Sequence, residues 1–169
     1  MTDILSKDLD IICWDSPHHH CPLEAVCKTL AIPAIIVYDL KMLRHHLQSV
    51  LQTPDAILIH DSSVIRKPGP IDWFMDAGTP VSTMADSPFI QLRNALDNEL
   101  GGFIDVPVIV VGAYPTTIEF FKEAGAAAVI RSTGRSYVEP VAWALMKLKG
   151  ATSLNCTRPE TYKWPEFKI

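Results

Sequence analysis

Short apolar runs alternate with amphipathic stretches along the chain and divide it into repeated strand–helix units. The apolar runs are predicted strands, because unbroken β-branched segments suit a parallel sheet that is covered on both faces. They lie at residues 10–15, 34–39, 56–61, 106–111 and 127–130. The intervening stretches carry apolar residues at helical spacing. They predict helices at residues 23–30, 40–52, 88–100, 118–124 and 137–148.

This order of elements predicts an α/β fold, a three-layer sandwich around a doubly wound, mainly parallel sheet of five or six strands. Residues 79–84 could form the sixth strand, and residues 71–77 a short helix. We expect one domain over residues 1–149, with an insertion around 62–105. Residues 150–169 are expected to form a C-terminal tail or linker.

Glycines and short polar residues mark the expected ends of these elements. Gly112 is expected to let the chain leave the sheet after the fourth strand, and Gly125 to end the following helix. Asp39 can cap the second helix, and Asp86 or Ser87 the third. Pro88 suits the first turn of that third helix.

Composition and charge argue against several classes of protein. The chain has 169 residues, 48% of them hydrophobic, and a net charge of −4, with no basic stripe that would favour direct nucleic-acid binding. No apolar run approaches the roughly 20 residues of a membrane span, and the start lacks the order of a secretory signal. Four cysteines show no CxxC pairing: Cys13, Cys21, Cys27 and Cys156. Reduced thiols in a cytoplasmic protein are therefore expected.

Three predicted strands end in aspartate, at Asp15, Asp39 and Asp61. In open α/β sheets, ligands gather beyond the carboxyl ends of the strands, so these side chains could form an Mg²⁺ or general-base cluster. They could equally cap the helices and loops that follow. For Asp39 a cap is the better interpretation, whereas both interpretations stay open for Asp15 and Asp61.

Two loops carry other candidate chemistry. His18, His19, His20 and Cys21 offer imidazole and thiol ligands for Zn²⁺ or Cu, although a solvated or pH-responsive loop is an alternative. The polar loop 132–136 could bind an anion through its backbone N–H groups, but helix capping explains it as well. No G-x-S-x-G motif or activated cysteine indicates a nucleophilic enzyme, and we expect the chain not to be an enzyme.

The segments VPVIVVGA, at Val106–Ala113, and EAGA, at Glu123–Ala126, stand at the spacing found in response-regulator receiver domains. The chain resembles that family over nearly all of residues 10–149, most closely at 54–61 and 106–131. The resemblance implies a flavodoxin-like receiver fold. A working receiver also implies an acidic pair that holds Mg²⁺, a phosphoacceptor aspartate, a Thr or Ser switch residue and a lysine.

This sequence departs from that set. By the resemblance, Asp15 falls at the acidic pair and Asp61 at the phosphoacceptor, although aligning Pro54-Asp55 with the family puts His60 there instead. Gly112 replaces the Thr or Ser, and Ser132 replaces the lysine. We therefore interpret the chain as a degenerate pseudo-receiver without phosphorylation chemistry. It then needs no cofactor, and Mg²⁺ would bind only if the pocket of Asp15 and Asp61 is functional.

In that family, receivers without the phosphorylation set commonly act through protein contacts, as dimers or with partner domains. The resemblance places the contact surface on Phe120, Lys122, Arg131, Arg135, Tyr137 and Trp143. It also implies that the chain could be the N-terminal part of a transcriptional or signalling regulator. Two alternatives remain: a phosphorylatable, Mg²⁺-dependent receiver that uses Asp61, and a metal or small-anion sensor built on His18–Cys21.

Overall fold

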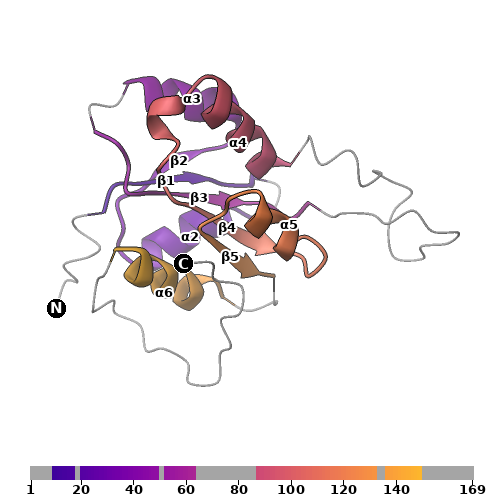
Figure 1. Cartoon of the computed structure of the whole chain (residues 1–169). Helices are drawn as coiled ribbons and strands as arrows, with labels where there is room; N and C mark the ends of the chain where they lie inside the picture. Colours follow the sequence, from indigo (N-terminus) through magenta and orange to yellow (C-terminus); the bar gives the residue numbers. More distant parts are fainter. Residues whose placement is uncertain (1–8, 18–19, 50–51, 64–86, 133–135, 150–169) are drawn as a thin grey trace, which may run out of the picture.

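Five parallel strands form one sheet at the centre of the molecule (Figure 1). The computed structural model describes residues 9–17, 20–49, 52–63, 87–132 and 136–149. The strand order is β2-β1-β3-β4-β5, in which every neighbouring pair is parallel. The strands are β1 (Ile11–Trp14), β2 (Ile35–Val37), β3 (Ala56–His60), β4 (Val108–Ala113) and β5 (Ala128–Arg131).

Helices cover both faces of this sheet and create two apolar cores. On one face lie α3 (Leu40–Ser49), α4 (Pro88–Asn98) and α5 (Ile118–Glu123), which pack over side chains such as Ile57 and Val110. On the other face lie α2 (Pro22–Thr29) and α6 (Val138–Lys149), which pack over Leu58 and Ile109. Successive strand residues point to opposite faces, so each strand serves both cores.

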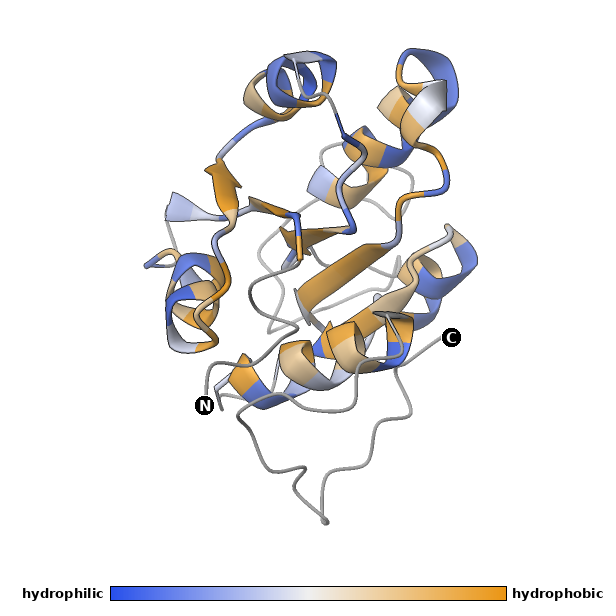
Figure 2. Cartoon of the chain, turned by 90° about the vertical axis from the view of Figure 1, so that its left-hand side faces the viewer, coloured by the Kyte–Doolittle hydropathy of each residue, from blue (hydrophilic) through white to orange (hydrophobic). Residues whose placement is uncertain are grey.

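The distribution of hydropathy follows from these layers. Figure 2 shows apolar strands at the centre and helices whose polar positions face outward. In β1, β3 and β4 all side chains are buried, as the unbroken apolar runs predicted. Burial of these side chains on both faces of the sheet contributes hydrophobic free energy to folding.

The predicted α/β sandwich and all five predicted strands and helices are confirmed. A short 3₁₀ turn, η3 (Gly101–Phe103), follows α4 and begins at a pair of glycines. Ser87 is the N-cap of α4, and its Oγ accepts a hydrogen bond from the Ile90 amide. The proposed helix at 71–77, the sixth strand at 79–84, much of the expected insertion and the tail at 150–169 lie outside the described residues.

The prediction that Gly112 lets the chain leave the sheet is wrong. Strand β4 continues through it to Ala113, and the pairing with β5 shifts register between Val111 and Ala113. Gly112 has φ of +86° and forms a β-bulge one residue before the end of β4. By contrast, Gly125 has φ of +103° and directly follows α5 and its C-cap residue, as expected.

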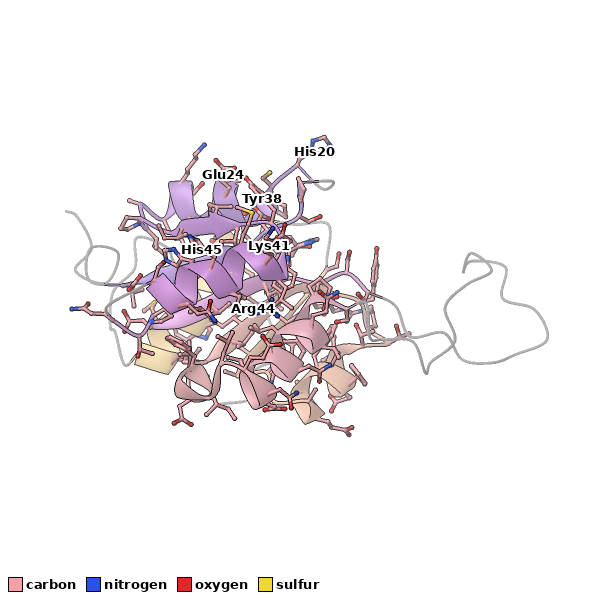
Figure 3. All side chains as sticks on the ribbon, turned by 90° about the horizontal axis from the view of Figure 1, so that it is seen from above. His20, Glu24, Tyr38, Lys41, Arg44 and His45 are labelled. Carbon is pink, nitrogen blue, oxygen red and sulfur yellow. The ribbon has the colours of Figure 1, made fainter. Side chains whose placement is uncertain are left out.

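The second strand was expected to be buried, but it lies at the edge of the sheet. Strand β2 pairs only with β1 among the described strands, and its first residue, Ile35, is 42% exposed. Tyr38 and Met42 nearby have similar exposure. Figure 3 shows Tyr38 on the same side of the molecule as Lys41 and His45. An apolar run alone does not reveal whether a strand is central or at an edge.

Candidate functional site

A cavity of about 360 Å³ opens beyond the carboxyl ends of β1, β2 and β3. The three strand-end aspartates predicted to gather there, Asp15, Asp39 and Asp61, all line it. His60 also lines the cavity. The remaining lining residues are Trp14, Ser16, Pro17, Tyr38, Leu40, Ser62, Ser63, Pro88 and Gln91.

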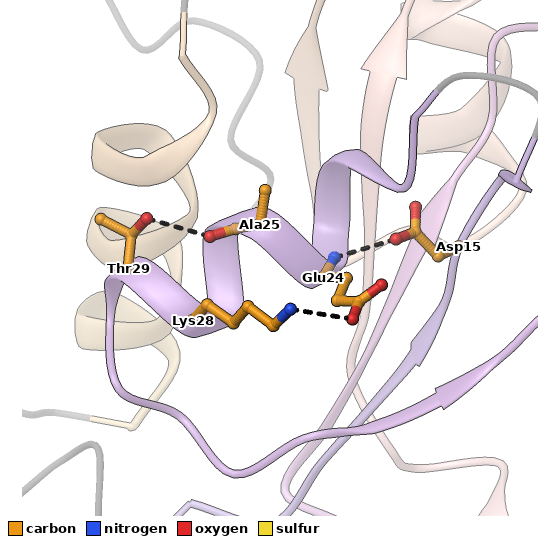
Figure 4. A network of polar contacts seen from close by, with 5 residues as sticks. All are labelled: Asp15, Glu24, Ala25, Lys28 and Thr29. Carbon is orange, nitrogen blue, oxygen red and sulfur yellow. Dashed lines mark hydrogen bonds and ion pairs between the residues drawn. The ribbon is translucent and has the colours of Figure 1, made fainter.

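Asp15 is buried and holds the N-terminus of α2. Its Oδ1 accepts hydrogen bonds from the amides of Ser16 (2.8 Å) and Leu23 (3.2 Å), and its Oδ2 accepts one from the Glu24 amide (2.9 Å). Figure 4 shows the bond to Glu24, whose own carboxylate pairs with Lys28. Pro22 has no N–H, and Cys21, the N-cap residue, makes no side-chain cap. Asp15 therefore supplies the acceptor that the first turn of α2 requires.

Asp61 is buried and holds the N-terminus of α4. Its Oδ2 accepts a hydrogen bond from the Phe89 amide (3.0 Å) and another from the hydroxyl of Ser87. Its Oδ1 accepts one from the Ser63 amide (3.0 Å). As in α2, a proline opens the helix and a strand-end carboxylate accepts the next amide along.

Asp39 caps α3 from a more exposed position, where its Oδ1 accepts a hydrogen bond from the Met42 amide (2.7 Å). All three strand-end aspartates are thus helix caps. The sequence left this interpretation open for Asp15 and Asp61. A negative charge at a helix N-terminus is also favourable, because the backbone dipoles leave that end partially positive.

His60 and Gly112 lie against each other at the ends of β3 and β4. The imidazole is 8% exposed, and a side-chain carbon added to Gly112 would lie 2.9 Å from Nε2 of His60. Parallel pairing sets His60 opposite Val111, one residue before Gly112. The imidazole of His60 therefore fills the space that a side chain at position 112 would take.

Ser132, which follows β5, completes this side of the strand ends. The hydroxyl of Tyr137 donates a long hydrogen bond (3.5 Å) to its Oγ, and the same hydroxyl would lie 3.4 Å from a side-chain carbon on Gly112. The structure thus brings together His60, Gly112, Ser132 and Tyr137. This group is polar and neutral or weakly basic, and Ser132 brings no fixed cation to the end of β5.

The His-rich loop is only partly described. His18 and His19 lie outside the described residues, His20 is exposed, and Cys21 is half-buried with a left-handed backbone. Among the residues that the structure describes, no group of three or more His, Cys, Asp or Glu side chains is arranged to hold a metal ion.

The residues of the expected contact surface lie on α5, β5, α6 and the segment before α6, and differ in exposure. Arg131 is exposed at the end of β5, an edge strand. Phe120 is half-buried and packs edge to face on Phe121. The Lys122 side chain is only 16% exposed and pairs with Glu119. Tyr137 and Trp143 are half-buried, and Arg135 lies outside the described residues.

Sequence reasoning missed two parts of this site. The hydroxyl of Ser87 donates to Asp61, a residue 26 positions earlier in the chain. Tyr38 forms a wall of the cavity from the edge of the sheet. The Ser87-Pro88 pair did indicate that a hydrogen-bond acceptor was needed. A proline at the first helical position marks the start of a helix, and the next amide, that of Phe89, then requires an acceptor such as Asp61.

The comparisons with known proteins agree with the fold. The receiver domain of a sensor histidine kinase from Pseudomonas aeruginosa, solved with a magnesium ion coordinated in its active-site cleft, aligns with a TM-score of 0.51 and 19% identity over 84% of this chain and 98% of that one. The signal receiver domain of a histidine kinase from Syntrophus aciditrophicus aligns with a TM-score of 0.52 and 17% identity, over 93% and 98%. No family model and no curated protein matches the sequence.

The chain therefore has the fold of receiver domains, a five-stranded parallel α/β sheet with helices on both faces. At this level of identity the likeness concerns the fold alone. None of the helices in the described part of the chain is long and apolar enough to cross a membrane.

Proposed function

We propose that this chain is a receiver-like regulatory domain that acts through protein–protein contacts and does not use phosphoryl transfer to Asp61. The observation that carries the proposal is the capping role of both buried strand-end carboxylates. Each of them accepts three hydrogen bonds: Asp15 accepts two from amides at the start of α2 and one from its neighbour, and Asp61 accepts one from an α4 amide, one from the hydroxyl of the N-cap residue and one from a loop amide.

These bonds compete with the chemistry of a working receiver. An ionised carboxylate has about four lone-pair sites, and three on each aspartate are already used. Accepting a phosphoryl group at Oδ2 of Asp61 would require release of the Phe89 amide and the Ser87 hydroxyl. The first turn of α4 would then lose its acceptor, at a cost of about 1–3 kcal/mol per buried donor left unpaired.

The ends of β4 and β5 support the same proposal. Gly112 offers no hydroxyl to contact a phosphoryl group, and the imidazole of His60 occupies the adjacent space. Ser132 at the end of β5 offers no cation to offset the added negative charge. In receivers, these two positions sense the phosphoryl group and relay its arrival to the surface.

The residues present do not fit a resident Mg²⁺ ion well. Mg²⁺ demands near-ideal octahedral geometry with oxygen ligands. Here the oxygens of Asp15 and Asp61 point to amide and hydroxyl donors.

We place the protein contact on the surface formed by α5, β5 and α6, the surface that the resemblance implies. Strand β5 is at the edge of the sheet, so its outer side is not paired with another described strand. Arg131 is exposed there and supplies a charge that a partner can recognise. The partner is a second copy of this chain or another protein, and the domain would serve in signalling or transcription regulation.

The test is a titration of the full chain with Mg²⁺ and then with beryllofluoride, which mimics a phosphoryl group, followed by amide NMR shifts. Light scattering on the same samples gives the mass. The proposal expects no saturable shift at Asp15, Asp61 or Phe89 and no change of mass. A saturable Mg²⁺-dependent shift centred on Asp61 would overturn it.

A second candidate function is a phosphorylatable receiver that uses Asp61 with Asp15. Two observations favour it. The cavity beyond the strand ends includes both carboxylates, and the structurally similar Pseudomonas receiver domain coordinates magnesium in its active-site cleft. The same titration separates the two functions, because only the second predicts a beryllofluoride-dependent shift.

A further inference from the structure

Two buried thiols face each other between the sheet and α2. The sulfur atoms of Cys13, in β1, and Cys27, in α2, lie 3.4 Å apart. Cys13 is fully buried, and Cys27 is 3% exposed. We propose that Cys13 and Cys27 are an oxidative modification site, a dithiol that closes to a disulfide and ties α2 to β1.

The two thiols share an apolar environment but differ in pKa. Both side chains lie in the apolar core between the sheet and α2, beside Leu23 and Val26. The hydrogen bond between the thiols, together with burial, raises the pKa of Cys13, and the same hydrogen bond lowers the pKa of Cys27. Cys27 lies on α2, the helix that covers the pair, whereas Cys13 lies on a strand inside the sheet, so we assign Cys27 as the attacking thiolate and Cys13 as the resolving thiol.

Access to the pair requires α2 to move away from the sheet, and the backbone around α2 is strained. Three residues other than glycine have a left-handed backbone in the described part of the chain: His20, Cys21 and Ala31, with φ of 60°, 50° and 56°. All three flank α2. Such residues cost free energy that local opening releases. Opening of α2 would expose Cys27 to a small oxidant.

The chemistry balances with a hydroperoxide as the oxidant. The Cys27 thiolate attacks one oxygen of hydrogen peroxide, the O–O bond breaks, and hydroxide leaves and takes a proton to become water. The resulting sulfenic acid is attacked by the sulfur of Cys13, which displaces a second hydroxide and forms the S–S bond. In total, two thiols and one peroxide give one disulfide and two water molecules.

The disulfide would act on the cavity described above. The loop between Cys13 and Cys27 contains Trp14, Asp15, Ser16 and Pro17, which form one wall of the cavity. It also contains the start of α2 that Asp15 caps. Oxidation would therefore fix that wall against the sheet. Closing a loop of this length is expected to raise the Tm by roughly 6 to 12 °C.

The experiment maps the disulfide in the full wild-type chain. The reduced protein is treated with hydrogen peroxide, its remaining thiols are blocked with N-ethylmaleimide under denaturing conditions, and it is digested without reduction. Cleavage before Asp15 and after Glu24 separates Cys13, Cys21 and Cys27 into different peptides. We expect one linked pair that joins the peptides of Cys13 and Cys27, two hydrogens lighter than their sum, with Cys21 blocked by maleimide.

Recovery of Cys13 and Cys27 as blocked thiols would overturn the proposal, as would a disulfide that involves Cys21 or Cys156. A pair of variants gives a second readout. Cys27→Ala should abolish the rise in Tm on oxidation, whereas Cys21→Ala, the matched control, should keep it. The peptide map needs no variant, so it decides the proposal even if Cys27→Ala fails to fold. Neither readout depends on the Mg²⁺ and beryllofluoride titration.

Discussion

The imidazole of His60 lies directly over Gly112, with Nε2 2.9 Å from the point at which a side chain on that glycine would begin. The two residues are complementary, because the bulge at Gly112 leaves the room that the imidazole fills. Under the proposed function, this strand end is the place where a working receiver carries a hydroxyl, and here the imidazole fills it.

This packing predicts a large effect of Gly112→Ala. The added carbon would clash with His60, and alanine is strained at φ of +86°. We expect the free energy of unfolding to fall by about 3 kcal/mol, of which about 1–2 kcal/mol is backbone strain and the rest overpacking. Urea unfolding followed by circular dichroism measures it.

Gly125→Ala is the matched control for that prediction. Gly125 also has a left-handed backbone, but its nearest neighbour is the flexible end of Arg93, 3.5 Å from the added carbon. Gly125→Ala should therefore lower the free energy of unfolding by the backbone strain alone, about 1 kcal/mol. In a His60→Ala background, Gly112→Ala should lose its clash and cost about as much as Gly125→Ala. An unchanged cost in that background would contradict the packing of His60 on Gly112.

Replacing each of the three capping aspartates with alanine should lower the free energy of unfolding by an amount that depends on how buried the cap is. Asp61→Ala leaves buried donors at the start of α4 without their acceptor, so we expect a loss of about 2–4 kcal/mol. Asp15→Ala should behave similarly at α2. Asp39→Ala removes one hydrogen bond at a more exposed cap, for an expected loss of about 1 kcal/mol. Urea unfolding of the three variants gives the ranking.

An Asp61→Ala variant no less stable than Asp39→Ala would count against this account. It would mean that the carboxylate of Asp61 is not needed by α4. That carboxylate would then be free to accept a phosphoryl group, as the second candidate function requires.

The proposed contact surface predicts a charge effect at Arg131. Arg131→Glu reverses an exposed charge at the end of β5, so it should weaken the self-association or partner binding of this face and leave the fold intact. Lys41→Glu makes the same change on α3, on the side of the sheet where β2 lies, and is the control (Figure 3). Light scattering over a range of concentrations measures the mass. Equal loss of association in both variants would point to net charge rather than to this surface.

Much of the fold could be predicted because its signals are local. Unbroken apolar runs identify strands that are buried on both faces, and the helices between them follow from their spacing and caps. The edge position of β2 could not be predicted, because it depends on strand order. Nor could the bulge at Gly112, since the sequence shows that a glycine is needed but not whether the strand ends there or kinks.

The sequence predicted which residues gather at the candidate site, but not how their side chains are arranged. Strand-end aspartates gather at one edge of any parallel sheet, so Asp15, Asp39 and Asp61 were expected together. What each carboxylate accepts depends on where α2 and α4 begin in space. Ser87 reaches Asp61 across a long segment of chain, and the closeness of Cys13 and Cys27 arises because α2 packs back on β1. Sequence spacing does not reveal such contacts.

The last prediction separates two reasons why Asp61 would not be phosphorylated, as proposed above: the absence of a lysine after β5, and the hydrogen bonds that its carboxylate already accepts. Ser132→Lys puts a cation at the end of β5, where working receivers carry one, and Ser132→Met adds similar length without charge. If the amides of α2 and α4 hold the carboxylates, neither variant should gain a Mg²⁺-dependent beryllofluoride shift at Asp61. A saturable shift in Ser132→Lys alone would show that the capping bonds yield to a ligand. The absent lysine would then be the decisive departure from a working receiver.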